Sequence, residues 1–161
     1  MPVKPAVLWV EDSARFELRN LVGPVYTSGK YVFDLAEDVT AAIDHLQARR
    51  FDALIVDVRL PPGMNPAWKK LYQQKNSKAQ AKLGLKFLYW LLAKDGAICP
   101  ETPPQWIRSE QIGVFTVEPQ NEIRSDLEIL GIKAFKQKVA GLSDMILLEI
   151  IEGLLNHRAT P

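Results

Sequence analysis

Acidic side chains follow two apolar runs of this sequence, at the points where the runs end. Glu11 and Asp12 follow "AVLWV", and Asp57 follows "ALIV". Two like charges about 4 Å apart repel by about 4 kcal/mol at an effective dielectric constant near 20. Three neighbouring carboxylates therefore need either a raised pKa or a cation. Oxygen ligands with room for water suit Mg²⁺, which commonly binds phosphate oxygens as well.

A hydroxyl group and an ammonium group follow two later apolar runs. Thr116 ends "IGVFT", and Lys138 ends "IKAFKQK". A lysine supplies a point charge and a threonine supplies a neutral donor, which are the groups needed to hold phosphoryl oxygens. With a carboxylate as the nucleophile, the five residues indicate a phosphoryl-transfer site. Each acid taken alone also has a simpler interpretation, as a cap on the turn that follows it.

These five residues meet only if the runs that carry them are parallel strands of one sheet. Strand and helix patterns alternate five times along the chain, and the strands are continuously apolar, as expected of a sheet covered on both faces. The alternation predicts an α/β fold, a three-layer doubly wound parallel sheet of five strands. Ligands of such sheets bind beyond the carboxyl ends of the strands. The expected strands are 6–10, 30–38, 53–58, 112–119 and 132–138.

Helical patterns lie between the expected strands. The first helix is expected to begin at Ser13, to bury Phe16, and to end at Gly23-Pro24. Asp38 is expected to cap the second helix. The other expected helices are 85–96, 120–130, 143–157 and an added helix from Pro66.

Composition places the chain among ordinary globular proteins. It has 161 residues, 47% apolar and 24% charged, so a single domain over 1–161 is expected. No apolar run is long enough for a membrane span, and the amino-terminal residues lack the apolar core of a secretion signal. Cys99 is the only cysteine, which excludes an intramolecular disulfide and a cysteine metal site. We expect a cytoplasmic location.

Lysines are concentrated in the middle of the chain. Between Pro62 and Lys94 there are seven lysines and no acid, which leaves 13 basic and 19 acidic residues elsewhere. One interpretation is a docking surface for an acidic partner or for nucleic acid, through a salt-dependent attraction. The other is a helix that packs Trp68 and Leu71 inward and points its lysines to solvent. The sequence leaves both open.

Two segments of this region are longer than a compact fold of this size needs. One is the lysine-rich segment at about 62–83, and the other is a proline-rich loop at about 96–111. Each segment contains a tryptophan, Trp68 in the first and Trp106 in the second. These rings either pack on each other or form a partner site.

Four motifs resemble those of the receiver domain of bacterial two-component response regulators. "VLWVEDS" is similar to that family's strand with an acidic pair, and "ALIVDVRLP" to the strand with its phosphoacceptor aspartate. "VFTVEP" is similar to the strand that ends in Ser or Thr, and "GIKAFKQK" to the segment that ends in lysine. The motifs occur in the family's order, from about Ala6 to the last helix. The resemblance implies the flavodoxin-like receiver fold, with strand order 2-1-3-4-5.

The resemblance also implies a phosphorelay function that depends on Mg²⁺. Asp57 would accept a phosphoryl group from a histidine kinase or phosphotransfer protein, without turnover of a separate substrate. Glu11, Asp12, Asp57 and the main-chain carbonyl of Arg59 would hold Mg²⁺. The output would be a protein target that binds the face made by 120–131, the fifth strand and the last helix.

Three further residues would bind the phosphoryl group or respond to it. By the resemblance, Lys138 pairs with phosphoryl oxygens, Thr116 moves to hydrogen-bond one of them, and Phe135 is the aromatic residue that turns inward. Val139 departs from the family, which usually has proline after the lysine. A cis bond before valine costs about 3 kcal/mol, so a trans bond is expected here.

Two charged residues are expected at the rim of the site. Arg59 lies two positions after Asp57, and Glu118 two positions after Thr116. We predict an ion pair between them, partly exposed and worth roughly 0–1 kcal/mol, which obstructs water and prolongs the phosphorylated state. The alternative is that both charges only keep the rim soluble.

Other classes of function fit these residues less well. A receiver-like binding module that does not use phosphorylation is the main alternative, because the proline after Lys138 is missing and the middle of the chain is altered. A phosphatase of the haloacid-dehalogenase type is disfavoured, because that family needs a second aspartate where this chain has Arg59.

Overall fold

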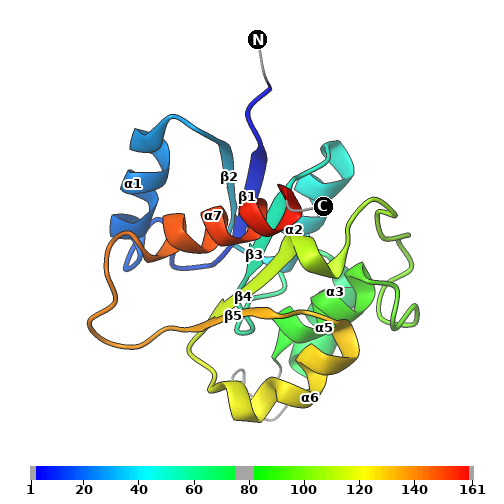
Figure 1. Ribbon diagram of the computed structural model, residues 1–161. Helices are drawn as coiled ribbons and strands as arrows, with labels where there is room; N and C mark the ends of the chain where they lie inside the picture. Colours follow the sequence, from blue (N-terminus) through cyan, green and yellow to red (C-terminus); the bar gives the residue numbers. More distant parts are fainter. Residues whose placement is uncertain (1–2, 75–81, 160–161) are drawn as a thin grey trace.

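The computed structural model describes residues 3–74 and 82–159. Its five strands are all parallel and form one sheet in the order β2-β1-β3-β4-β5, which confirms the predicted topology (Figure 1). The strands are β1 (Ala6–Val10), β2 (Val32–Ala36), β3 (Ala53–Val56), β4 (Ile112–Thr116) and β5 (Ala134–Gln137).

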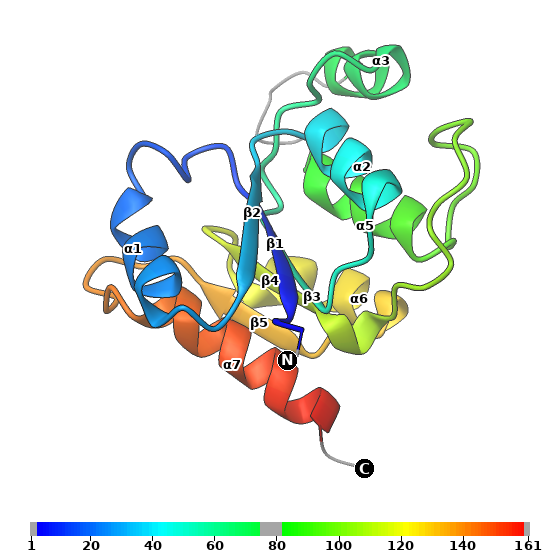
Figure 2. The ribbon, with the colours of Figure 1, turned by 90° about the horizontal axis from the view of Figure 1, so that it is seen from above.

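Helices cover both faces of the sheet, giving three layers (Figure 2). One face carries α1 (Arg19–Ser28) and α7 (Ile146–Ala159). The other carries α2 (Val39–Ala48), α3 (Pro66–Gln73), α5 (Leu83–Leu91) and α6 (Gln120–Leu130). A short 3-10 helix, Ser109–Gln111, precedes β4. None of the described helices is long and apolar enough to cross a membrane.

Each sheet face has its own hydrophobic core. Side chains alternate along a strand, so in β1 Val7 and Trp9 join the core under α1 and α7, whereas Leu8 and Val10 join the other. All four residues are fully buried. The continuous apolar runs of the sequence are therefore explained by burial on both faces.

The first helix differs from the sequence-based prediction. It begins at Arg19 rather than near Ser13, and it continues through Gly23 and Pro24 to Ser28. Phe16, expected in the buried stripe, is 71% exposed in the turn before the helix. Proline inside a helix normally breaks it. Here the stripe of buried residues continues past the proline, with Leu21 and Val25 packed in the core beneath α7, and this packing outweighs the local preference.

Two other helix ends have their predicted signals. The Asp38 carboxylate accepts a hydrogen bond from the Ala41 backbone N–H at 2.7 Å, so Asp38 caps α2 as predicted. Gly131 ends α6 with a φ of 72°, in the left-handed region that glycine adopts at low cost. The first strand has the expected bounds, the other four are shorter than expected at one or both ends, and the helices expected at 85–96 and 143–157 have different ends as α5 and α7.

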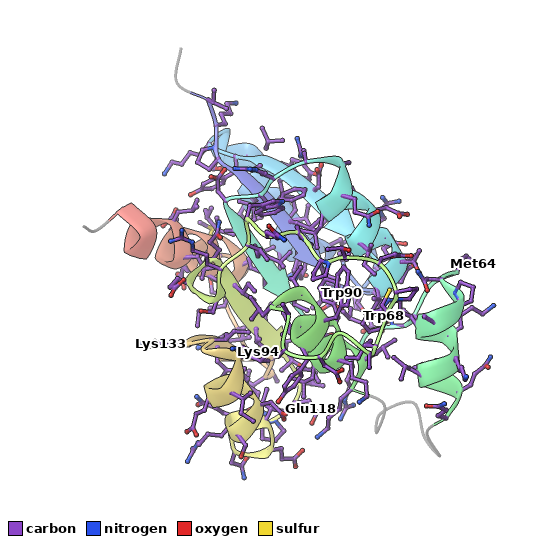
Figure 3. The ribbon with its side chains drawn as sticks, turned by 90° about the vertical axis from the view of Figure 1, so that its right-hand side faces the viewer. Met64, Trp68, Trp90, Lys94, Glu118 and Lys133 are labelled. Atoms are coloured by element: carbon purple, nitrogen blue, oxygen red, sulfur yellow. The ribbon has the colours of Figure 1, made fainter. Side chains whose placement is uncertain are left out.

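The predicted helix at Pro66 is present as α3, with Pro66 in its first turn and Asn65 as its N-cap. Trp68 is fully buried against Phe87 and Trp90 of α5, at ring-centroid distances of 6.4 and 6.3 Å (Figure 3). The exposed residues of α3 include Lys69 and Lys70. Trp68 is therefore a core residue, and residues 75–81 of the lysine-rich segment lie outside the described part of the chain.

The two extra segments are joined to each other. Asn65 Nδ2 donates a hydrogen bond to Glu101 Oε1, and Trp90 Nε1 donates one to the Glu101 carbonyl oxygen, both at 2.9 Å. Trp106 is half-buried against the same core as Trp68. The described parts of the lysine-rich and proline-rich segments thus contact each other beside α5.

Replacing Trp68 tests whether α3 is part of the core. Trp68→Ala removes a fully buried ring and is expected to lower the free energy of unfolding by about 3–5 kcal/mol. Lys69→Ala, at the adjacent exposed position, is the matched control and should change it by less than about 0.5 kcal/mol. Urea unfolding measures both. Equal effects of the two substitutions would contradict the assignment.

Candidate functional site

The predicted acidic residues come together at the carboxyl end of the sheet. Val10 pairs with Val56, so β1 and β3 end side by side, and the Asp57 backbone N–H donates to the Val10 carbonyl at 3.1 Å. Glu11, Asp12 and Asp57 each have a carboxylate oxygen within 4.8 Å of the others. Glu11 and Asp57 are 1% and 4% exposed, whereas Asp12 is open to solvent.

Lys138 joins this cluster from the end of β5. Its Nζ donates to Asp57 Oδ2 at 3.0 Å and also to Glu11 Oε1. The Lys138 backbone N–H donates to the Thr116 carbonyl at 2.7 Å, which fixes the lysine beside β4. No described peptide bond is cis. Lys138 therefore reaches both carboxylates with a trans bond to Val139, as predicted.

The cluster shifts the pKa values of its members. Burial, and then the charge of Asp57, raise the pKa of Glu11 to about 8, although Lys138 opposes this shift. Burial alone would lower the pKa of Lys138, but the Asp57 and Glu11 carboxylates raise it above its ordinary value. The single ammonium group of Lys138 therefore does not fully offset the cost of burying the Glu11 and Asp57 carboxylates.

The donor set fits a hard divalent cation. Three carboxylates have oxygen atoms close to one another. A cation such as Mg²⁺ would stabilise this partly buried group of like charges. The Arg59 backbone N–H donates to Asp57 Oδ1 at 3.3 Å, which places the residue at the site. A metal contact by its main-chain carbonyl stays a prediction.

Thr116 and Phe135 lie on neighbouring strands, β4 and β5. Thr116 is fully buried, and its hydroxyl accepts a hydrogen bond from the Glu118 backbone N–H at 3.4 Å. Phe135 pairs with Val114 across the strands and packs half-buried against the core below α6. The switch role of Thr116 and Phe135, and the movement of either side chain, stay predictions.

The predicted ion pair at the rim is present. Arg59 Nε lies 2.7 Å from Glu118 Oε1. The expectation that the pair is partly exposed is right for Arg59, whose side chain is 48% exposed, but wrong for Glu118, which is 3% exposed. No local sequence signal indicates this burial, because a charged residue just after a strand usually faces solvent.

Gly84 is a further structural residue of the site. A Cβ atom at this position would lie 1.9 Å from the Asp57 carbonyl oxygen, so α5 approaches the strand end closely. The Gly84 N–H also donates to the Val58 carbonyl at 2.8 Å. The contact of Gly84 with Asp57 depends on the fold and has no signal of its own in the local sequence.

Comparison with known proteins agrees with this arrangement. By sequence, no family model and no curated protein matches the chain. By structure, it is similar to the chemotaxis protein CheY4 of Vibrio cholerae, with a TM-score of 0.60 and 22% identity over 95% of this chain and all of that one. It is also similar to the receiver domain of Francisella response regulator 1452, with a TM-score of 0.61 and 15% identity over 96% and 99% of the two chains.

A third similar structure is the CheY-like receiver domain protein of Methanospirillum hungatei, with a TM-score of 0.58, 15% identity and 98% of both chains covered. The sheet order and the flanking helices define a flavodoxin-like fold. Within that class, the chain has the fold of response-regulator receiver domains.

Glu11→Gln is expected to stabilise the metal-free protein. The pKa of Glu11 rises from 4.5 to about 8 on folding, so the folded state binds more protons between these values. The stability contribution of Glu11 is therefore highest below about pH 4.5 and is lost as pH rises toward about 8. Glutamine imitates the protonated acid, so its advantage should grow to about 1–3 kcal/mol at pH 7.5.

The measurement is urea unfolding in chelator at pH 5 and pH 7.5. Glu17→Gln, which removes an exposed acid, is the matched control. A gain that is the same at both pH values would contradict the raised pKa.

Proposed function

We propose that this chain is a phosphoacceptor receiver domain of a two-component phosphorelay, phosphorylated on Asp57 in the presence of Mg²⁺. The observation that carries this proposal is the cluster of Glu11, Asp12, Asp57 and Lys138 at the carboxyl end of a receiver-like sheet. On this view residues 1–161 are one receiver domain in the cytoplasm, and it accepts a phosphoryl group without being a turnover enzyme.

The nucleophile in this proposal is the Asp57 carboxylate. One of its oxygens attacks the phosphorus of a phosphohistidine on a kinase or phosphotransfer protein, a P–O bond forms, and the P–N bond to the imidazole breaks. Lys138 already donates to Asp57 Oδ2, so its ammonium group is placed to neutralise charge on the transferred group. Mg²⁺ held by Glu11, Asp12 and Asp57 would supply further charge neutralisation.

Arg59 and Glu118, at the rim of the site, would help to exclude water from Asp57. Asp57 is 4% exposed, and the Arg59–Glu118 pair lies beside it. A nearly buried acyl phosphate with the Arg59 side chain at its mouth is less open to attack by water. Arg59 therefore favours a long phosphorylated lifetime.

The proposed output surface is the face built by α6, β5 and α7, which binds a downstream protein. A groove of about 500 Å³ follows β5 and α7, and its lining includes the predicted switch residue Phe135. A change of Phe135 would therefore alter the shape of this groove. A receiver-like binding module that does not use phosphorylation stays the second candidate, favoured by the missing proline after Lys138.

Phosphorylation is tested by the intact mass of the protein after incubation with Mg²⁺ and acetyl phosphate. We expect a gain of one phosphoryl group, which is lost in Asp57→Asn and without Mg²⁺. Asp44→Asn, at an exposed acid of α2, is the matched control and should behave as wild type. A protein that stays unmodified with every small phosphodonor supports the binding module instead.

Arg59→Ala is expected to shorten the half-life of phosphorylated Asp57 severalfold, because it opens the mouth of the site to water. Decay of the phosphorylated mass after donor removal measures the half-life. Arg49→Ala, which removes an arginine paired with Asp34 away from the site, is the control. An unchanged half-life in Arg59→Ala would show that the pair does not obstruct water.

A further inference from the structure

Glu118 is a buried carboxylate whose charge partner is half exposed. Its side chain is 3% exposed and accepts a hydrogen bond from Arg59 Nε at 2.7 Å, whereas the Arg59 side chain is 48% exposed. A buried carboxylate is strongly unfavourable without a partner. The state of Glu118 therefore depends on whether Arg59 stays in place, and Arg59 has room to move.

The same two residues connect the phosphoacceptor to the threonine hydroxyl. The Arg59 backbone N–H donates to Asp57 Oδ1 at 3.3 Å, and the Glu118 backbone N–H donates to Thr116 Oγ1 at 3.4 Å. Together with the ion pair, these contacts form a chain from Asp57 through Arg59 and Glu118 to Thr116. This chain does not pass through Lys138.

We propose that Arg59 is a second phosphoryl-binding residue, which releases Glu118 and pairs with the phosphoryl group when Asp57 is phosphorylated. The proposal rests on the proposed function. A phosphoryl group carries more negative charge than one carboxylate and offers three acceptor oxygens. A guanidinium group matches that geometry with two parallel hydrogen bonds. Arg59 is only two residues from Asp57, and its exposed side chain moves without disturbing the core.

Release of Glu118 explains how the change reaches α6. Without Arg59 the carboxylate cannot stay buried at low cost, so Glu118 turns toward solvent. Its backbone N–H then leaves the Thr116 hydroxyl, which becomes free to bond a phosphoryl oxygen. Pro119 follows directly and is the N-cap residue of α6. The exchange thus links phosphorylation to the start of the helix on the proposed output face.

Arg59 either stays paired with Glu118 or moves to the phosphoryl group. The two possibilities predict different changes in affinity for a phosphoryl mimic. The experiment measures the affinity for beryllofluoride, a stable phosphoryl mimic, in saturating Mg²⁺ by ¹⁹F NMR. If Arg59 exchanges, Arg59→Ala removes a ligand and weakens binding, by about tenfold for one charge-assisted contact. Glu118→Gln removes the competing charge and tightens binding by a similar factor. The double variant should bind like Arg59→Ala, because the Glu118 carboxylate competes with the phosphoryl mimic only for Arg59.

Other outcomes separate this proposal from the function on which it rests. If wild type does not bind beryllofluoride, or if Asp57→Asn binds equally well, the proposed function fails. If wild type binds, but Arg59→Ala and Glu118→Gln shift the affinity in the same direction or not at all, the pair is a static rim and the exchange is wrong. Thermal unfolding of each variant checks folding. If Arg59→Ala does not fold, Arg59→Lys, which keeps the charge but loses the paired hydrogen bonds, should weaken binding to a smaller extent.

Discussion

Repulsion among the carboxylates at the ends of β1 and β3 is the constraint on which the site depends. The parallel register that builds the sheet also places Glu11 beside Asp57, so the fold itself creates the unfavourable charge. Lys138 relieves part of it by contacting both acids. The pKa of Glu11 is still raised, first by burial and then by the charge of Asp57, so Lys138 does not balance the site completely. This imbalance supports the proposed affinity for a cation and then for a phosphoryl group.

The sequence predicted those features that follow from strand order. Once the apolar runs are taken as parallel strands, their ends must meet, and Glu11, Asp57, Thr116 and Lys138 lie where that reasoning places them. The features that it missed depend on packing between distant segments. The first helix continues through Pro24 because its buried residues pack in the core beneath α7. These contacts cannot be predicted from the local sequence.

The burial of Glu118 is a second case of this kind. The charge of Glu118 and its position after a strand favour a surface location. The ion pair with Arg59, 59 residues away in the chain, stabilises the buried carboxylate. The positions of residues in the two extra segments also depend on packing between distant parts of the chain. Trp68 was expected either in the core or at a partner site, and it fills the space over Phe87 and Trp90. The described residues of the two extra segments therefore add Trp68, Cys99 and Ile107 to the hydrophobic core.

The close approach of Gly84 to Asp57 has a mechanical consequence. The carbonyl of Asp57 is braced by the first turn of α5, where there is no space even for a methyl group. α5 in turn packs through Phe87 and Trp90 against Trp68 of α3. Any side chain at position 84 would therefore force either the Asp57 backbone or α5 to move. The strand end that carries Asp57 and the helix that packs against the added α3 are thus held at a separation that only glycine permits.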